Sequence, residues 1–152
     1  MFQKIAYFAT EVGIPTGLSY EQSSYGPYAA SLKRRVGQLV NNGLVIEDRL
    51  GQMFMVKVGP TFHDAKRAYQ GELEAYDRDL EDVADLFARM NTNQAEVAAT
   101  VHFAAKVLRD RTGEVPSESD VLAYAEDWKV RRRPPIGRLE FASAIRNLAA
   151  LG

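Results

Sequence analysis

The sequence predicts a mainly α protein with a small β-hairpin, in which a winged-helix-like N-terminal half is followed by a helical C-terminal extension. Residues 25–58 contain a helical pattern, an Asn-Gly exit and two strand patterns in immediate succession, which is the order of the second half of a winged helix. From residue 61 onward, apolar residues recur at the three- and four-residue steps of amphipathic helices. We therefore expect a winged-helix-like module over residues 1–60 and a helical extension over residues 61–152, packed together as one structural unit.

The first predicted element is an amphipathic helix over residues 1–12. Gly13 closes this helix, and its apolar positions share one face: Phe2, Ile5, Ala6, Ala9 and Val12. Because nothing before Phe2 supplies a helix N-cap, we expect that Met1 truncates or replaces an upstream segment of a longer natural chain. A turn is predicted over residues 14–17, and a short strand or an extended loop over residues 18–22.

The string Tyr25-Gly26-Pro27-Tyr28 is the most unusual short sequence in the chain. One interpretation is structural: Pro27 is well tolerated just ahead of or inside the first turn of a helix, so the string marks the start of the second helix. The other interpretation is functional. Tyrosine offers a large contact area with little rotamer entropy to lose, so Tyr25 and Tyr28 are candidate partner-binding residues.

A second helix with an exposed basic side is predicted over residues 29–40, followed by a β-hairpin. Its buried face is expected to consist of Ala29, Leu32, Val36, Leu39 and Val40. Lys33, Arg34 and Arg35 lie mostly on the opposite side and are the candidate nucleic-acid-binding residues. Gly43 ends the helix, and strands over residues 44–49 and 53–58 form the wing.

One long helical pattern with an acidic side covers residues 61–90. Gly71 lies inside it and predicts a bend or a break, because glycine destabilises a helix relative to alanine. The acidic residues between positions 72 and 85 have two interpretations, a solvated helix face or a surface that docks a basic partner. Under the second interpretation, Glu81, Asp82 and Asp85 are candidate partner-binding residues.

Three further helices are predicted over residues 94–111, 117–129 and 136–151, with Ser117 as the N-cap of the middle one. His102 is expected to be a hydrogen-bonded or exposed structural histidine. The loop Arg131-Arg132-Arg133-Pro134-Pro135 also has two interpretations. It is either a site for a phosphate or an acidic partner, or a charge cluster that complements the C-terminus of the preceding helix.

Composition excludes several classes of site. The chain has no Cys and only two His, so disulfides, thiolate zinc sites and Cys nucleophiles are excluded, and we predict no metal and no cofactor. Gly-rich phosphate loops, nucleophile-elbow serines and His-Glu helix motifs are also missing from the sequence, so we predict no catalytic residues and no enzyme. Without a leader sequence or a long apolar run, the expected location is the cytoplasm, with no membrane partner.

The net charge of -1 hides a segregation of charge along the chain. Residues 61–90 carry four Lys/Arg and eight Asp/Glu, whereas residues 1–60 carry six and four, and residues 91–152 carry nine and eight. A chain of this balance does not wrap nucleic acid over its whole surface, although a locally basic helix can still meet phosphate.

Two separated strings resemble a known family. The chain contains Phe2-Gln3-Lys4-Ile5-Ala6-Tyr7-Phe8, then Tyr25-Gly26-Pro27-Tyr28 and Leu32. This pattern resembles that of Panacea-type antitoxin domains and, still more, that of the domain that follows the macrodomain in DarG-like DNA ADP-ribosyl glycohydrolase antitoxins. The similarity is best over residues 2–45, and the Arg131–Pro135 loop and the closing Ile145–Leu151 run extend it to the C-terminus.

In that family, the macrodomain removes ADP-ribose from DNA, and the following domain is associated with holding a DarT-like toxin. This chain contains no macrodomain sequence, so no glycohydrolase residue is carried over. The resemblance implies that the chain is the C-terminal part of a longer macrodomain protein. It also implies that Tyr25, Gly26, Pro27 and Tyr28 are a shared structural signature.

The leading hypothesis is therefore a non-catalytic antitoxin domain that binds a cognate toxin protein. Its acidic helix, residues 72–85, would occupy a basic DNA-binding surface of that toxin. The alternative is a winged-helix transcriptional regulator that binds DNA through Lys33, Arg34 and Arg35, with the wing touching the backbone. An enzyme is the third and weakest hypothesis, and the sequence leaves the oligomeric state open.

Overall fold

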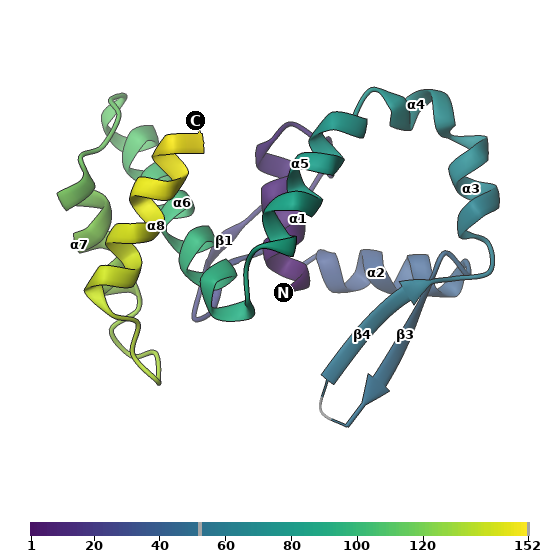
Figure 1. Ribbon diagram of the computed structural model, residues 1–152, viewed down its shortest axis with the longest axis horizontal. Coiled ribbons are helices and arrows are strands. Elements are labelled where there is room, and N and C mark those ends of the chain that lie inside the picture. Colours follow the sequence, from purple (N-terminus) through teal and green to yellow (C-terminus); the bar gives the residue numbers. More distant parts are fainter. Residues whose placement is uncertain (52, 152) are drawn as a thin grey trace.

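The computed structural model describes residues 1–51 and 53–151, which form eight α-helices and two antiparallel β-hairpins (Figure 1). The helices are α1 Phe2–Glu11, α2 Leu32–Asn41, α3 Phe62–Ala68, α4 Gln70–Glu74, α5 Asp77–Ala88, α6 Thr92–Thr112, α7 Glu118–Trp128 and α8 Arg138–Leu151. The hairpins pair β1 Glu21–Ser23 with β2 Gly26–Tyr28, and β3 Val45–Leu50 with β4 Met53–Val58. The predicted class, mainly α with a small hairpin, is confirmed. Within the described ranges, no helix combines the length and the apolar character that crossing a membrane requires.

Helix α6 lies at the centre of the core. Its first half is buried on all sides, over an unbroken run of residues from Ala95 to Val101. One side packs against α7 and α8 through Val101, Leu122 and Phe141, and another side packs against α1. A capping box formed by Asn91 and Gln94 starts α6, and Gly113, in the left-handed conformation, ends it.

Helix α1 packs through a different face from the predicted one. Phe2, Ile5 and Val12, expected on the buried side, are between 37% and 43% exposed. Tyr7 and Phe8 are buried instead, in an aromatic cluster with Tyr20, Phe87, His102 and Phe103. The rings of Tyr7 and Phe8 bury more apolar surface than the predicted face would, and their edge-to-face contacts add to this gain. These two residues therefore decide how the helix is rotated about its axis.

The Tyr25–Tyr28 string does not start a helix, so this prediction is wrong. Tyr25 lies in the turn of the first hairpin, and Gly26 to Tyr28 form strand β2, in which Pro27 pairs with Gln22. Gly26 adopts a φ of +115°, which side-chain-bearing residues rarely reach, and its buried backbone lets the chain turn close to α6. Pro27 is almost completely buried. A proline is tolerated in this strand because a two-stranded sheet has only edge strands, in which the missing N–H of proline can face away from the partner strand.

Helix α2 and the second hairpin follow as predicted: β4 has the predicted bounds, and the bounds of α2 and β3 are shifted by one to three residues. Ala29, Leu32 and Val36 form a small buried cluster, whereas Leu39 is 38% exposed near the end of α2. The base of the hairpin lies very close to the end of α2. The amide of Thr61 donates to the carbonyl oxygen of Gly43 at 3.1 Å, and that of Gly59 donates to Leu44 at 2.9 Å.

The predicted long helix over residues 61–90 is divided into α3, α4 and α5. The breaks fall at Tyr69 and at residues 75–76, while Gly71 lies inside α4. Helices α3 and α4 bury no side chain, and Figure 1 shows them as an arch that connects the wing to α5. Without tertiary packing, short helices have only local propensity to hold them, which explains the interruptions. Helix α5 packs on α1, where the rings of Phe87 and Phe8 have centroids 5.8 Å apart.

Candidate functional site

An open groove of about 980 Å³ lies between the first hairpin and the segment that follows α7. It brings together two sets of candidate residues from distant parts of the sequence. Tyr25 and Tyr28 lie on the hairpin side, and the arginine loop, which we define as residues 130–134, forms the other side. The remaining lining residues are Glu21, Gln22, Ser23, Ser24, Asp127 and Trp128.

The hairpin side of the groove is fastened to the C-terminal half of α7. Three consecutive hairpin residues each accept one hydrogen bond from α7 or its C-cap. Gln22 Oε1 accepts from the Tyr124 hydroxyl at 2.7 Å, Ser23 O from Trp128 Nε1 at 2.8 Å, and Ser24 O from Lys129 Nζ at 2.7 Å. The turn that carries Tyr25 is therefore held in place on its helix, while the Tyr25 side chain is 69% exposed.

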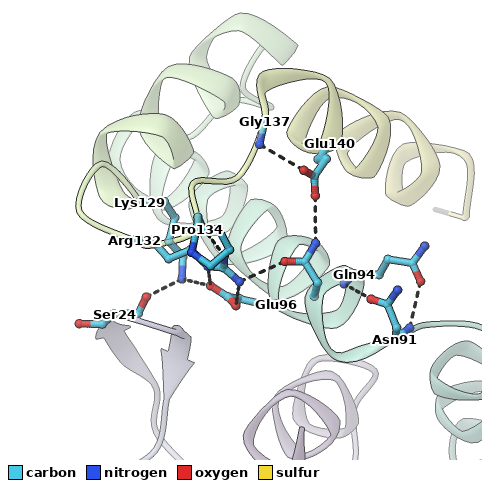
Figure 2. A network of polar contacts seen from close by, with 10 residues as sticks. Ser24, Asn91, Gln94, Glu96, Lys129, Arg132, Pro134, Gly137 and Glu140 are labelled. Atoms are coloured by element: carbon cyan, nitrogen blue, oxygen red, sulfur yellow. Dashed lines mark hydrogen bonds and ion pairs between the residues drawn. The ribbon is translucent and has the colours of Figure 1, made fainter.

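Beneath the groove, the carboxylate of Glu96 on α6 connects the two sides (Figure 2). Glu96 Oε1 accepts hydrogen bonds from Lys129 Nζ at 2.9 Å and from Arg132 Nε at 3.0 Å, and Oε2 accepts from Arg132 Nη2 at 2.9 Å. Lys129 in turn reaches the carbonyl oxygen of Ser24 on the hairpin. Glu96 and Lys129 are only 5% and 4% exposed, so this is an internal ion cluster.

The charges of the cluster change the titration of Glu96. Burial alone would raise the pKa of its carboxyl group, but the hydrogen bonds and charges of Arg132 and Lys129 outweigh burial and hold this pKa below its ordinary value. The carboxylate is therefore ionised at neutral pH, whereas burial lowers the pKa of Lys129 from its ordinary value and Glu96 partly offsets this.

The arginine loop is fixed at several further points. Arg132 Nη2 donates to Asn93 Oδ1 at 3.0 Å, and Arg132 also donates to the carbonyl oxygen of Pro134. Asn93 donates to Glu140 Oε2 at 2.9 Å, and Glu140 accepts from the amide of Gly137 at 3.3 Å (Figure 2). The loop is thus tied to α6 and to the first turn of α8.

The three arginines of the loop differ in their surroundings. The side chain of Arg132 is 15% exposed and is bound by Glu96, whereas Arg131 and Arg133 are exposed. Arg133 donates through Nη1 to the carbonyl oxygens of Val130 and Arg132, at 3.1 and 2.9 Å. Two exposed guanidinium groups therefore flank one internal guanidinium group.

The acidic candidates lie elsewhere. Glu81, Asp82 and Asp85 are exposed on α5, and Asp85 forms an ion pair with Arg89 at 3.1 Å. None of them lines the groove. Glu81 and Asp85 occupy the side of α5 opposite Val83, which is buried, and Asp82 lies on the flank between the two sides.

The basic candidates on α2 form a third location. Lys33, Arg34 and Arg35 are all exposed. Arg35 is engaged with the preceding turn, because its Nη1 donates to the carbonyl oxygen of Thr16 at 2.8 Å. Lys33 and Arg34 thus present the exposed positive charge of this helix.

Among the described residues, no group of three or more His, Cys, Asp and Glu side chains is placed to hold a metal ion. His102 is hydrogen bonded, as expected for a structural histidine, with its Nδ1 2.7 Å from the hydroxyl of Tyr7. Burial raises the pKa of Tyr7 and lowers the pKa of His102, so a neutral hydroxyl shares this hydrogen bond with a neutral imidazole.

Sequence reasoning missed Glu96 and Lys129, the two most buried charged residues of the site. One signal was present for Glu96. It lies between Ala95 and Val97, inside the apolar face predicted for α6, where an unpaired carboxylate would be very costly. Nothing in the sequence signals the burial of Lys129.

A comparison with protein-family models finds no match to this chain, and a comparison with curated proteins finds none either.

Proposed function

We propose that this chain is the non-catalytic, partner-binding domain of a DarG-like antitoxin, and that it binds and neutralises a DNA ADP-ribosyltransferase toxin in the cytoplasm. The observation that carries the proposal is the groove, which exposes Tyr25, Arg131 and Arg133 above a fixed base. Tyrosine and arginine are among the residue types that dominate binding energy at protein interfaces. Because the hairpin and the loop are already held by α7 and Glu96, little ordering is needed when a partner binds.

The contacts of the family-like residues support the proposal. Gln3, in the first string, exchanges two hydrogen bonds with Ala29, which directly follows the second string. Ala29 N donates to Gln3 Oε1 at 2.9 Å, and Gln3 Nε2 donates to Ala29 O at 3.1 Å. Tyr7 is completely buried, and Pro27 is nearly so. Helix α1 thus packs against strand β2, which gives a physical reason for the two strings to occur together.

The acidic side of α5 supplies the proposed mechanism of neutralisation. An enzyme that modifies DNA holds its substrate with a positively charged surface. The exposed carboxylates of Glu81, Asp82 and Asp85 complement such a surface, so the bound domain would exclude DNA from it.

The test measures binding of the chain to the toxin encoded beside its natural gene, with duplex DNA as a parallel analyte. We expect toxin binding that survives moderate salt, and a loss of more than about tenfold for Tyr25→Ala, since truncation of a hot-spot tyrosine costs ~2 kcal/mol or more. Toxin binding that is absent, or unchanged by Tyr25→Ala, would overturn the proposal for the groove. The matched control is Tyr69→Ala, because Tyr69 is 59% exposed and lies outside the groove.

The mechanism of neutralisation has its own test. The triple variant Glu81→Lys, Asp82→Lys, Asp85→Lys should lose both toxin binding and inhibition of DNA modification, because three charges on the contact face are reversed and its net charge changes by six units. The control triple variant Glu114→Lys, Glu118→Lys, Asp120→Lys makes the same charge change around the start of α7. Equal inhibition by wild type and the α5 variant would remove the mechanism.

A second candidate function is DNA binding by α2 and the wing, favoured by the exposure of Lys33 and Arg34 on the helix that precedes the hairpin. Phosphate contacts are strongest at low salt. A gel-shift assay at low salt that finds affinity for duplex DNA, lost in Lys33→Ala, Arg34→Ala, would support this function. The absence of affinity under these conditions would exclude it.

A further inference from the structure

We propose that Arg131 and Arg133 form a carboxylate receptor, which together with Tyr25 selects an acidic segment of a protein partner. This inference deepens the proposed function, because the partner that would supply the segment is the toxin. The receptor itself rests on the groove, and it can be tested without the toxin.

The middle arginine of the loop is committed to internal contacts, because four of its five N–H groups already donate to neighbouring acceptors. Arg132 places Nε and Nη2 on the two oxygens of Glu96, with a further bond from Nη2 to Asn93, and it also binds the carbonyl oxygen of Pro134. A ligand that took Arg132 would leave the buried carboxylate of Glu96 without its main partner, which is strongly unfavourable. Arg132 therefore positions the loop and does not contact the partner.

Because Arg132 is anchored, its two neighbours in the chain are held at the groove. Arg131 is exposed. In the part of the chain that the structure describes, Arg133 donates hydrogen bonds only through Nη1, to two backbone carbonyl oxygens of its own loop. These bonds orient the guanidinium plane. The remaining N–H edge of a guanidinium group matches the two oxygens of a carboxylate, a geometry that lysine cannot reproduce.

The charges of the groove favour a protein segment over nucleic acid as its ligand. Glu21 and Asp127 line the same groove as the three arginines, so the groove carries charges of both signs. A continuous row of phosphates would meet these two carboxylates, whereas a peptide offers isolated carboxylates together with N–H donors. Tyr25 and Tyr28 add apolar ring surface for the side chains between them.

The direct test titrates the peptide Gly-Glu-Leu-Gly-Glu-Leu, whose two carboxylates are isolated from each other, into the folded chain and follows the tyrosine and arginine side-chain signals by NMR. We expect Arg131→Ala, Arg133→Ala to bind the peptide at least about tenfold more weakly than wild type, the loss that one charge-assisted hydrogen bond accounts for. The matched control Lys66→Ala, Arg67→Ala removes the same charge from α3, where both residues are exposed outside the groove, and should bind like wild type. Arg131→Lys, Arg133→Lys should fall between them, because lysine keeps the charge without the fork.

Two results of this titration would overturn the receptor. One is equal peptide binding by wild type and Arg131→Ala, Arg133→Ala. The other is tighter binding of oligothymidylate than of the Gly-Glu-Leu-Gly-Glu-Leu peptide, lost in the same variant, which would make the groove a nucleic-acid site. Thermal unfolding of each variant confirms that the fold is intact, and the exposure of both arginines predicts no change.

Failure of the receptor and failure of the proposed function give different results. If the peptide binds as expected and the toxin does not bind at all, the receptor stands and the antitoxin function falls. If the toxin binds equally to wild type and to Arg131→Ala, Arg133→Ala, the antitoxin function stands and the receptor falls.

Discussion

Glu96 is the residue on which the shape of the candidate site depends. Its carboxylate lies inside the most buried helix, and three hydrogen bonds from Lys129 and Arg132 compensate for its lost hydration. An apolar residue there would fill α6 equally well, but it would leave two cations without a common partner. The cluster is a device for holding the hairpin and the arginine loop at a fixed separation.

The first prediction concerns Glu96→Gln, which keeps the volume and removes the charge. We expect it to lower the free energy of unfolding by about 3–5 kcal/mol, the usual cost of breaking a buried ion pair, as measured by urea denaturation. The control Glu118→Gln removes the exposed partner of Arg146 and should cost less than about 1 kcal/mol. Equal effects of the two substitutions would contradict a structural role for the cluster.

The same residue predicts a pH dependence. The folded-state pKa of Glu96 lies below its unfolded value, so the stability that its ionised form contributes is fully present above the unfolded pKa, about 4.3. This contribution is lost as the pH falls from there through the folded-state pKa. Wild type should therefore lose stability more steeply than Glu96→Gln over this acidic range, and parallel curves would contradict the assignment.

His102 predicts a second pH dependence, at higher pH. Burial lowers its folded-state pKa, an effect that Lys106 reinforces and Glu11 partly offsets. The unfolded chain therefore binds a proton first, and stability falls as the pH drops below about 6.5. His102→Asn, which stays neutral and retains an acceptor for Tyr7, should flatten the curve between about pH 7 and pH 5. His63→Asn, at an exposed position in α3, is the matched control.

At the scale of elements, the junction between α2 and the wing depends on one glycine. A Cβ at Gly59 would lie 2.2 Å from the carbonyl oxygen of Gly43, so one of the two backbones has to move. We expect Gly59→Ala to destabilise the protein by about 1–3 kcal/mol, the cost of overpacking. Gly37→Ala is the matched control. Gly37 lies in α2, and a Cβ added there would have no atom within 4 Å, so the substitution should stabilise the protein by ~0.5–1 kcal/mol. Thermal unfolding of both variants measures the difference, and a neutral Gly59→Ala would contradict the close approach.

The sequence predicted the elements that are defined by local signals. Helix α6, the Ser117 N-cap of α7 and the β3–β4 hairpin all have periodicity, capping residues or turn residues of their own, and all three are confirmed. The β1–β2 hairpin was missed because Pro27 is far more common at helix starts than inside strands. Its strands are three residues long and are fixed by bonds to α7, which sequence patterns do not show.

The rotation of α1 could not be predicted either. Its sequence contains an aliphatic stripe and a pair of aromatic residues on different sides, and only the partner helices decide which side is buried. The aromatic pair wins because Tyr20, Phe87 and His102 provide ring contacts for it.

At the scale of the whole molecule, the groove could be predicted only in parts. Tyr25, Tyr28 and the arginines were candidates from the sequence, each for a separate reason, but their meeting depends on the packing of the hairpin against α7. The acidic side of α5 and the basic side of α2 remain separate surfaces. The molecule thus presents three charged surfaces, and the antitoxin hypothesis assigns the groove and α5 to the partner.

The most direct measurement of this assignment is amide hydrogen exchange of the chain alone and bound to the toxin. We predict that binding protects the hairpin turn around Tyr25 and the arginine loop, together with the exposed side of α5, and leaves α2 and the β3–β4 hairpin unchanged. Protection confined to α2 and the wing, with the groove unchanged, would contradict the account and would make the basic helix the binding surface.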